Sequence, residues 1–193
     1  MAAAMEVLLP SLLDGRATFK LINHGSKSNL LTRLPNRLHG YTNWHGDWRV
    51  LVLVDRDQDD CLALKRRLEA AAATANLPTK SNPDPVGRFR VVNRIVVEEL
   101  EAWFFGDPDA LRRAYPRLSM TALNKAPFRA PDRIVEGTWE ALLRTLQGAG
   151  YYRGTSSLPK IALARAVAAA MNPDCNHSPS FQAFRQGLNA LLA

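Results

Sequence analysis

The chain has 193 residues, 47% hydrophobic and 22% charged, which is enough for one domain with a complete core. This composition excludes a disordered chain, and no apolar run reaches the roughly 18 residues that a membrane span needs. The 25 lysines and arginines outnumber the 18 aspartates and glutamates, and this net charge of +7 is compatible with a nucleic-acid partner or with a plain solvated basic surface.

The N-terminal part of the chain predicts a helix, a strand and a second helix. Residues 2–13 are helix formers apart from Pro10. The segment ATFKLINH, residues 17–24, alternates apolar and polar side chains as a half-buried strand does. The segment 25–41 reads as a loop that enters a helix, whose buried stripe is Leu30, Leu31 and Leu34.

Two further strands, each followed by a helix, are predicted next. The run 49–54 is almost entirely apolar, as expected for a strand that is buried on both faces. The apolar residues from Cys61 to Ala75 recur at helical spacing and predict a helix of about 18 residues. Three prolines and a glycine mark 77–87 as a loop. The β-branched segment 88–97 then predicts a strand that runs directly into a helix at EELEAWFFGD.

This alternation of strands and helices is typical of a parallel sheet covered by helices, so we predict an α/β fold. The last third of the chain has a helical pattern. We therefore expect a single domain over residues 1–193, with an α/β core at 1–106 and a helical extension at 107–193.

Three polar residues are predicted to cap helices of this extension. Asp107 and Ser178 each precede a proline, and proline favours the first position of a helix. Ser157 can cap a helix that carries Ile161, Leu163, Ala164 and Ala168.

The two cysteines, Cys61 and Cys175, form neither a disulfide framework nor a metal-binding spacing. The start of the chain lacks the basic region and the long apolar core of a signal peptide. We therefore expect a protein of the reducing cytoplasm that does not associate with membranes.

Acidic residues gather where two of the predicted strands end. Asp55, Asp57, Asp59 and Asp60 follow one strand and Glu98, Glu99 and Glu101 follow the next, which is seven of the 18 acidic residues. Ligands of open parallel sheets bind beyond the carboxyl ends of the strands, so these side chains converge if the strands are neighbours. Carboxylates at close range need a cation to neutralise them, and Mg²⁺ or Mn²⁺ is the cation that suits oxygen ligands.

Local explanations compete with a metal site at some of these positions. Asp57 or Asp59 can cap the following helix, Asp60 suits its first turn, and Glu98 and Glu101 fit a solvated helix face. Asp55 has no such local use, because nothing requires a carboxylate directly after a buried strand. Its position therefore favours function.

A second candidate position lies at the loop HGSKSN, residues 24–29. Gly25, Lys27 and Ser28 follow a predicted strand and open a predicted helix, where phosphate binds well. The loop has a single glycine, so it is not a nucleotide-binding phosphate loop of the usual pattern. A phosphate contact of Lys27 is one possibility, and a solvated lysine is the other.

Five segments in order resemble a bacterial family known as domain-of-unknown-function family 4276. They are LVLVDRDQDDCLALKRRLEA, RVVNRIVVEELEAWFFGD, GTWEALLRTLQGAGYY, LPKIALARAVAAAMNP and HSPSFQAFRQGL, and the resemblance covers nearly the whole chain. The family is similar to the Toprim superfamily, the metal-dependent fold of topoisomerases, primases and the nucleases of overcoming-lysogenization-defect type. The resemblance therefore implies a Toprim-like parallel sheet with covering helices and a helical C-terminal extension.

The resemblance also implies roles for individual residues. The Asp-x-Asp motif of Toprim proteins falls on Asp55 and Asp57, and the family's Glu-Leu-Glu-Ala-Trp segment falls on residues 99–103. Its Gly-x-Lys-Ser loop falls on Gly25, Lys27 and Ser28. The implied catalytic residues are Asp55, Asp57 and Glu99, the ligands of Mg²⁺ (or Mn²⁺) are Asp55, Asp57, Glu99 and Glu101, and the phosphate-binding residues are Lys27 and Ser28.

One departure from the family pattern concerns the first strand. Family members open with a strand that ends in a glutamate, the proposed general acid or base, whereas this chain starts inside the helix that follows, at MAAAMEVLLPSLL. Glu6 lies within that helix and cannot replace the glutamate. The resemblance therefore predicts that the chain by itself has little activity. Two explanations of the missing strand stay open: the start codon is misplaced, or the protein is a degenerate copy of the family.

The function that we expect is Mg²⁺-dependent, nuclease-like phosphodiester chemistry on nucleic acid, DNA rather than RNA. The resemblance implies an ABC/SMC-like ATPase as partner, in defence against phage or mobile elements. The alternative from another class is a non-catalytic interaction subunit of such an ATPase. A nucleotide-binding regulator of the receiver type fits less well, because no phosphoacceptor setting surrounds the aspartates.

Overall fold

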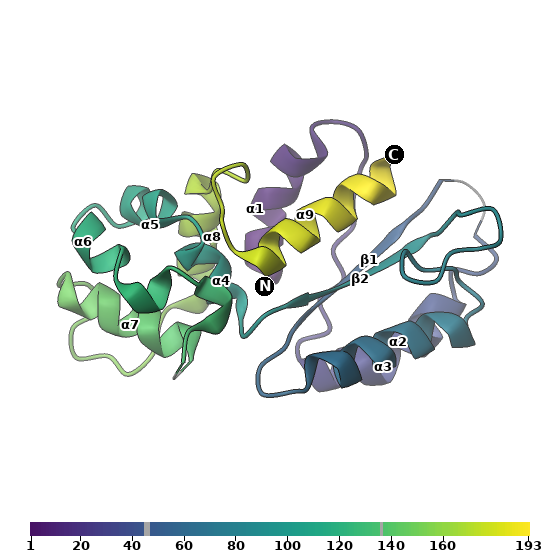
Figure 1. Cartoon of the computed structure of the whole chain (residues 1–193), viewed down its shortest axis with the longest axis horizontal. Helices are drawn as coiled ribbons and strands as arrows, with labels where there is room; N and C mark the ends of the chain where they lie inside the picture. Colours follow the sequence, from purple (N-terminus) through teal and green to yellow (C-terminus); the bar gives the residue numbers. More distant parts are fainter. Residues whose placement is uncertain (45–46, 136) are drawn as a thin grey trace. The chain divides into compact units, whose positions relative to one another are not determined.

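A computed structural model describes residues 1–44, 47–135 and 137–193. Its elements follow the chain as Figure 1 labels them. They are α1 (Ala2–Leu13), α2 (Lys27–His39), β1 (Val50–Asp55), α3 (Cys61–Thr74), β2 (Val91–Val96), α4 (Leu100–Phe105), α5 (Pro108–Ala114), α6 (Met120–Leu123), the 3₁₀ turns η1 (Ala126–Phe128) and η2 (Pro131–Arg133), α7 (Thr138–Gly148), α8 (Lys160–Ala170) and α9 (Pro179–Leu192).

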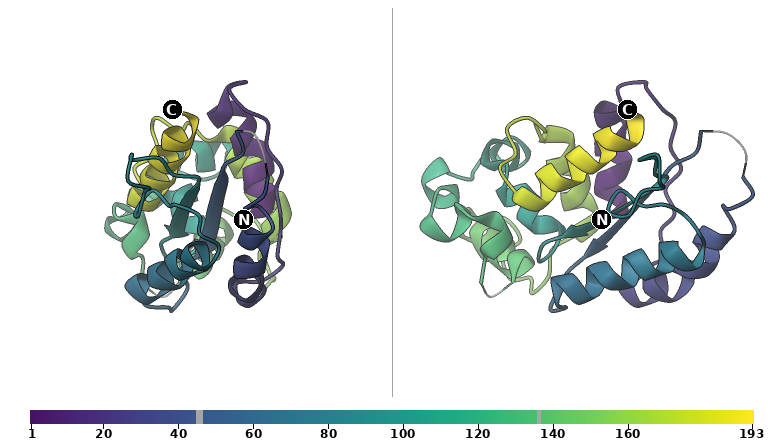
Figure 2. Two further views of the ribbon diagram at one scale, coloured as in Figure 1. Left: turned by 90° about the vertical axis from the view of Figure 1, so that its right-hand side faces the viewer. Right: turned by 45° about the vertical axis from the view of Figure 1, so that its right-hand side comes forward.

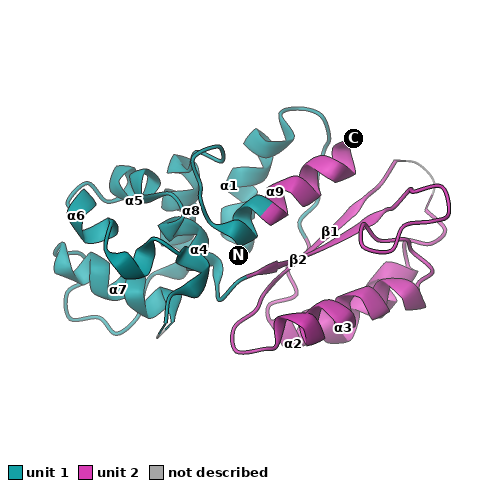
Figure 3. Ribbon diagram, viewed as in Figure 1, with its two compact units in different colours: residues 1–21, 97–182 teal, residues 22–96, 183–193 magenta. Residues whose placement is uncertain are grey.

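The chain divides into two compact units, drawn in two colours in Figure 3. We call residues 22–96 together with 183–193 the sheet unit, and residues 1–21 together with 97–182 the helical unit. This grouping differs from the expected core and extension, because α1 groups with the C-terminal helices and the end of α9 groups with the strands. Each unit contains one free cysteine: Cys61 is half-buried in the sheet unit, and Cys175 is exposed in the helical unit.

The sheet unit confirms the predicted α/β fold with a parallel sheet covered by helices. β1 and β2 pair in parallel, in a register that runs from Val50 opposite Val91 to Asp55 opposite Val96, and they are the two strands of the sheet in the described residues. Figure 2 shows α2 and α3 together on one face of this sheet. The core on this face consists of Leu34, Leu38, Val52, Val54, Leu64, Leu68, Ala71, Ala72, Ala75, Leu77 and Val91.

The end of α9 approaches β2 within the sheet unit. Arg94 Nε donates a hydrogen bond of 2.7 Å to the carbonyl oxygen of Ala183. Gly187 lies so close to β2 that a Cβ atom at this position would be 2.8 Å from Val92 Cγ1 and 2.7 Å from Arg94 Nε. A glycine in this helix therefore allows it to approach the strand closely.

Several predicted elements have different bounds or are not formed. The strand predicted at 17–24 is wrong: this segment has no regular structure, and Phe19 is 44% exposed. The helix after β1 has 14 residues instead of about 18, and β2 begins at Val91 instead of residue 88. The cap predicted at Ser157 is also wrong, because α8 begins after Pro159 without a side-chain cap.

The helical unit is built around buried aromatic and aliphatic side chains. α1 and α5 each pack against α8. The largest fully buried side chains of this unit are Leu8, Trp103, Phe104, Phe105, Leu111, Leu142, Leu146, Leu163 and Phe181. Within the described parts of the chain, no helix has the length and apolar character that crossing a membrane requires.

Candidate functional site

The turn after β1 surrounds one lysine ammonium with oxygen atoms. Lys27 Nζ lies 2.6 Å from Asp57 Oδ2 and 2.8 Å from Asp59 Oδ2, and it donates a hydrogen bond of 2.8 Å to the carbonyl oxygen of Arg56. We call these four residues the cation cradle. Two of the aspartates assigned to a metal or a cap thus have a protein cation as their partner.

The backbone of the turn holds these oxygens in place. Asp57 has a φ of 49°, in the left-handed region that aspartate tolerates better than most residues. Arg56 N donates to the carbonyl of Val96 at 2.8 Å, so the ladder of the sheet continues into the turn. Asp60 caps α3, since its Oδ1 accepts a hydrogen bond of 2.7 Å from Ala63 N. Asp60, rather than Asp57 or Asp59, is therefore the capping residue of this turn.

The loop before α2 presents Lys27 to the turn. Ser26 caps α2 by accepting a hydrogen bond from Asn29 N, and Gly25 has a φ of 79° that glycine adopts without strain. The predicted start of a helix is confirmed for Lys27 and Ser28, whereas Gly25 precedes the capping residue and the strand expected before it is not formed. Ser28 is exposed in the first turn of α2. Phosphate binding by Lys27 and Ser28 stays a prediction.

Electrostatics favour the charged forms within the cradle. Partial burial lowers the pKa of Lys27, but hydrogen bonds and attraction to Asp57 and Asp59 outweigh it and leave the pKa raised. The hydrogen bond from Lys27, together with its positive charge, lowers the pKa of Asp59. Both directions mean that Lys27 and Asp59 stabilise one another's ionised state.

The remaining predicted site residues lie on both sides of the division between the units. Asp55 is the half-buried last residue of β1, in the sheet unit. Glu99 belongs to the helical unit, where its Oε2 accepts hydrogen bonds from Thr138 Oγ1 at 3.0 Å and Trp139 N at 3.3 Å. Glu99 therefore supports the N-terminus of α7.

Glu101 is a less suitable metal ligand than the sequence predicts. It lies in the first turn of α4 with only 6% of its surface exposed. Burial raises the pKa of this carboxyl, and the negative charge of Glu99 raises it further. A raised pKa favours the neutral acid, whereas a metal ligand must be ionised.

The oxygen atoms of the cradle suit a hard divalent cation, provided that the ion displaces the ammonium of Lys27. Carboxylate and carbonyl oxygens are the ligands that Mg²⁺ prefers, and the cradle supplies both. The ammonium of Lys27 occupies this set of oxygens, so a metal ion would have to displace it. Among the described residues, no group of three or more histidine, cysteine, aspartate or glutamate side chains has the arrangement of a metal site.

A polar network inside the sheet unit was missed by the sequence prediction. Glu69 accepts hydrogen bonds from Asn93 Nδ2, at 3.0 Å, and from Thr79 Oγ1, and it pairs with Lys65 Nζ at 3.3 Å. Burial raises the pKa of Glu69, but the hydrogen bonds from Thr79 and Asn93 outweigh burial and leave the pKa lowered. A sequence signal for this network is Asn93, a polar residue directly after Val91 and Val92 in the predicted strand.

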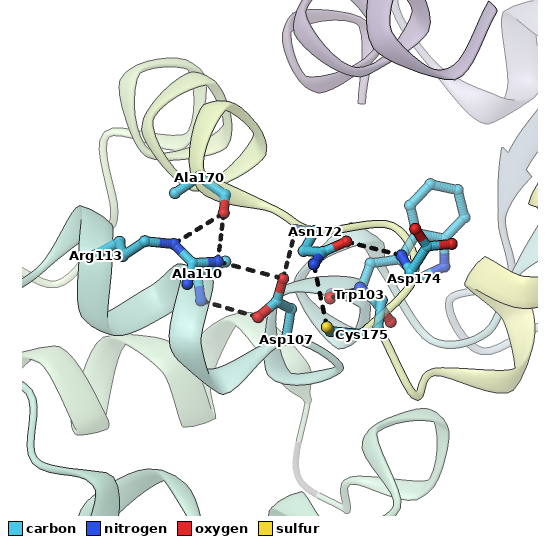
Figure 4. A network of polar contacts seen from close by, with 9 residues as sticks. Trp103, Asp107, Ala110, Arg113, Ala170, Asn172, Asp174 and Cys175 are labelled. Carbon is cyan, nitrogen blue, oxygen red and sulfur yellow. Dashed lines mark hydrogen bonds and ion pairs between the residues drawn. The ribbon is translucent and has the colours of Figure 1, made fainter.

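The helical unit has its own buried carboxylate, shown in Figure 4. Asp107 is 2% exposed and caps α5 through a hydrogen bond of 2.9 Å from Ala110 N to its Oδ1. Its Oδ2 accepts a 2.7 Å hydrogen bond from Asn172 N and lies 3.8 Å from Arg113, which also donates to the carbonyl of Ala170. The caps predicted at Asp107 and Ser178 are both confirmed, since Ser178 Oγ accepts from Phe181 N.

Comparisons with known proteins give one match. A family model described as "Domain of unknown function (DUF4276)" matches residues 1–189. Neither the curated proteins nor the solved structures contain a significant match to the chain.

Proposed function

Since the chain belongs to the family of unknown function DUF4276, we propose that it carries Mg²⁺-dependent, nuclease-like phosphodiester chemistry on nucleic acid, as partner of an ABC/SMC-like ATPase. The observation that carries this proposal is the cation cradle after β1, where two carboxylates and a carbonyl surround one positive charge. The resemblance of the Asp55-x-Asp57 motif to Toprim proteins supports it and suggests a Toprim-like fold.

The residues that the resemblance implies have different parts in this proposal. Asp55 and Asp57 would hold Mg²⁺ or Mn²⁺, which supplies positive charge to a phosphate when it is bound. Lys27, released from the carboxylates, would contact a phosphate together with Ser28. Glu99 is the third carboxylate that the resemblance implies, but in the helical unit it accepts hydrogen bonds at the N-terminus of α7, so the proposal rests on the residues of the sheet unit. Glu101, also in the helical unit, is not used as a ligand in this proposal, because burial favours its neutral form.

Backbone strain at Asp57 supports a functional turn. A non-glycine residue in the left-handed region carries a cost on the order of 1 kcal/mol, and such residues are frequent at ligand-binding sites. The same turn contains two of the carboxylates of the cradle, Asp57 and Asp59. The strain and the charge cluster thus coincide at the end of one strand.

A thermal-shift titration tests the metal site. Binding to the folded state raises the melting temperature by mass action, so Mn²⁺ should stabilise the wild type. The double variant Asp55→Asn/Asp57→Asn should lose this stabilisation. Lys27→Met should bind Mn²⁺ more tightly, because it removes the competing ammonium, and Lys80→Met, an exposed lysine of the same unit, is the matched control.

Equal stabilisation of the wild type and the double variant would contradict the site. A plasmid-nicking assay, with and without the ATPase, then tests the chemistry. We expect weak, metal-dependent nicking that Asp55→Asn abolishes. Nicking that persists in Asp55→Asn would exclude this turn as its source.

A second candidate function is a non-catalytic interaction subunit. The position of Lys27 favours it, because an internal cation already neutralises the acidic turn without a metal. For such a subunit, neither the wild type nor Lys27→Met should respond to Mn²⁺. Tight binding to the ATPase by the wild type and by Asp55→Asn alike would then identify the interaction subunit.

A further inference from the structure

Three aromatic side chains of the sheet unit pack against one another beyond the end of α2. The rings of Tyr41 and Trp44 meet edge to face with centroids 4.8 Å apart, and the centroids of Tyr41 and Trp48 are 5.6 Å apart. Trp48 Nε1 donates a hydrogen bond of 2.9 Å to the carbonyl of Trp44. Trp44 is nevertheless 57% exposed, so the cluster supports an indole ring that remains accessible to solvent.

Arginines flank this aromatic cluster. Arg33 and Arg37 are exposed and lie four residues apart on α2, hence on the same side of the helix. The guanidinium of Arg90 lies 4.9 Å from the ring centroid of Trp48. None of the three arginines forms an ion pair with a carboxylate of the described residues.

The pKa of a nearby histidine indicates that the electrostatic potential near these arginines is positive. Burial lowers the pKa of His24, and the charges of Arg37 and Arg33 lower it further. The arginines thus disfavour a second cation in their neighbourhood. The same positive charges attract an anion.

Two grooves lie at this surface, and Trp44 lines both of them. One has a volume of about 610 Å³ and includes Asn43, Asn76 and Arg90 in its lining. The other has a volume of about 380 Å³ and is lined by Arg33, Arg37 and Tyr41, among others. No aspartate or glutamate lines either groove within the described parts of the chain.

An exposed aromatic ring between arginine-lined grooves matches one class of ligand. Single-stranded nucleic acid offers phosphates to the arginines and unpaired bases whose flat faces stack on aromatic rings. A duplex hides these faces within its base stack, and an acidic peptide offers charge without them. We propose that Arg33, Arg37, Tyr41, Trp44, Trp48 and Arg90, the aromatic–arginine surface, bind single-stranded nucleic acid with a base stacked on Trp44.

This inference names the form of nucleic acid that the proposed function would act on. It rests on the aromatic–arginine surface and not on the residues of the cation cradle. It requires neither Asp55 nor a metal ion. Binding measured in the presence of EDTA therefore tests it separately from the cation cradle. Binding of single strands should persist in EDTA, whether or not the proposed chemistry is right.

The experiment is fluorescence anisotropy with labelled 12-nucleotide single strands of DNA and of RNA, in EDTA and at several salt concentrations. Trp44→Ala should weaken binding about ten- to a hundredfold, the usual effect of losing one stacked base. Trp44→Phe keeps a ring and should retain most of the affinity. Arg33→Gln with Arg37→Gln should reduce the slope of log affinity against log salt by about 1.4, since each single-strand phosphate contact contributes about 0.7.

The matched control is Arg66→Gln with Arg67→Gln, which removes the same charge from exposed positions of α3. It should change affinity much less than the α2 pair. Equal losses of affinity in the two double variants would overturn the proposal in favour of diffuse attraction to a basic surface. The proposal is equally overturned if a blunt duplex binds as tightly as the single strand, if an acidic peptide binds and the oligonucleotides do not, or if no oligonucleotide binds at low salt.

Discussion

The two units of this protein use their charged residues in different ways. The sheet unit has 13 lysines and arginines against seven aspartates and glutamates, an excess of six, whereas the helical unit has 12 against 11, an excess of one. Almost all of the net charge of +7 therefore belongs to the sheet unit. The basic character that the composition spreads over the whole chain is a property of one part of it.

The acidic residues differ between the units as well. In the helical unit, carboxylates accept backbone N–H groups at helix N-termini: Asp107 at α5, Glu99 at α7, and Asp132 at α9 through Ser180 N at 2.7 Å. Acids at such positions stabilise helices by hydrogen bonding and by the helix dipole. In the sheet unit, Asp57 and Asp59 instead surround a lysine. The acids named here support helix N-termini in the helical unit, whereas in the sheet unit Asp60 has that role and Asp57 and Asp59 pair with Lys27.

The largest effect should come from Asp107 in the helical unit. Asp107→Ala leaves the N–H groups of Ala110 and Asn172 without their acceptor in a buried place. We expect a loss on the order of 3 kcal/mol, or roughly 6–12 °C in melting temperature. Asp109→Ala, at an exposed position of the same helix turn, should cost less than about 1 kcal/mol. Similar losses in both variants would break the assignment of a structural role to Asp107.

A pair of helical glycines should give effects of opposite sign. Gly187→Ala places a Cβ against Val92 and Arg94 in the sheet unit, so overpacking should outweigh the gain in helix propensity and cost about 1 kcal/mol. Gly148→Ala, in α7 of the helical unit, meets no atom within 4 Å and should stabilise by up to about 1 kcal/mol. Urea unfolding measures both changes. A stabilising Gly187→Ala would show that α9 does not approach β2 closely.

A smaller effect, with a pH dependence, is expected at Glu101. Its pKa is raised by burial, so the folded state favours the protonated acid and loses stability as pH rises above the ordinary value of 4.5. Glu101→Gln should therefore have a higher melting temperature than the wild type at pH 7, and the difference should shrink towards pH 4. Asp14→Asn at an exposed position is the control. A Glu101→Gln variant that melts below the wild type at pH 7 would mean that the ionised carboxylate is needed.

The smallest effect should come from Lys27, whose ion pairs are partly exposed. The lowered pKa of Asp59 gives stability that is present above its ordinary pKa of 3.8 and is lost as pH falls through the lowered value. The raised pKa of Lys27 gives stability that is present below 10.5 and is lost at still higher pH. Lys27→Met should thus have a slightly lower urea midpoint than the wild type at pH 7, and the difference should shrink as pH falls below 3.8. A pH-independent difference would assign the effect to packing.

Sequence patterns predicted the elements that depend on local interactions. The caps at Asp107 and Ser178 were predictable, because each satisfies an N–H group three residues away. The strands β1 and β2 were predictable from their apolar runs, although in β1 only Val52 and Val54 are buried and its other residues are half-buried. The segment 17–24 shows the limit: its alternation is typical of a strand, but a strand also needs a partner, and this segment has none among the described residues.

The candidate site was predictable in its residue types but not in its pairings. Asp57 and Asp59 follow a strand, which indicated a cation, and Lys27 opens a helix, which indicated an anion. The ion pairs between Lys27 and the two aspartates join residues about 30 positions apart. They depend on the packing of α2 beside the turn. Likewise, Glu99 reaches Thr138 over 39 residues, and no local pattern contains that information.

The single cysteine in each unit provides a natural reporter. Cys175 is exposed and should react at once with a thiol reagent, whereas the half-buried Cys61 should react more slowly until the sheet unit opens. Pulsed alkylation followed by mass spectrometry can therefore follow the opening of the sheet unit without any engineered label. A donor–acceptor dye pair attached to the two sulfur atoms would, in addition, report the separation of the two units in solution, with and without nucleic acid.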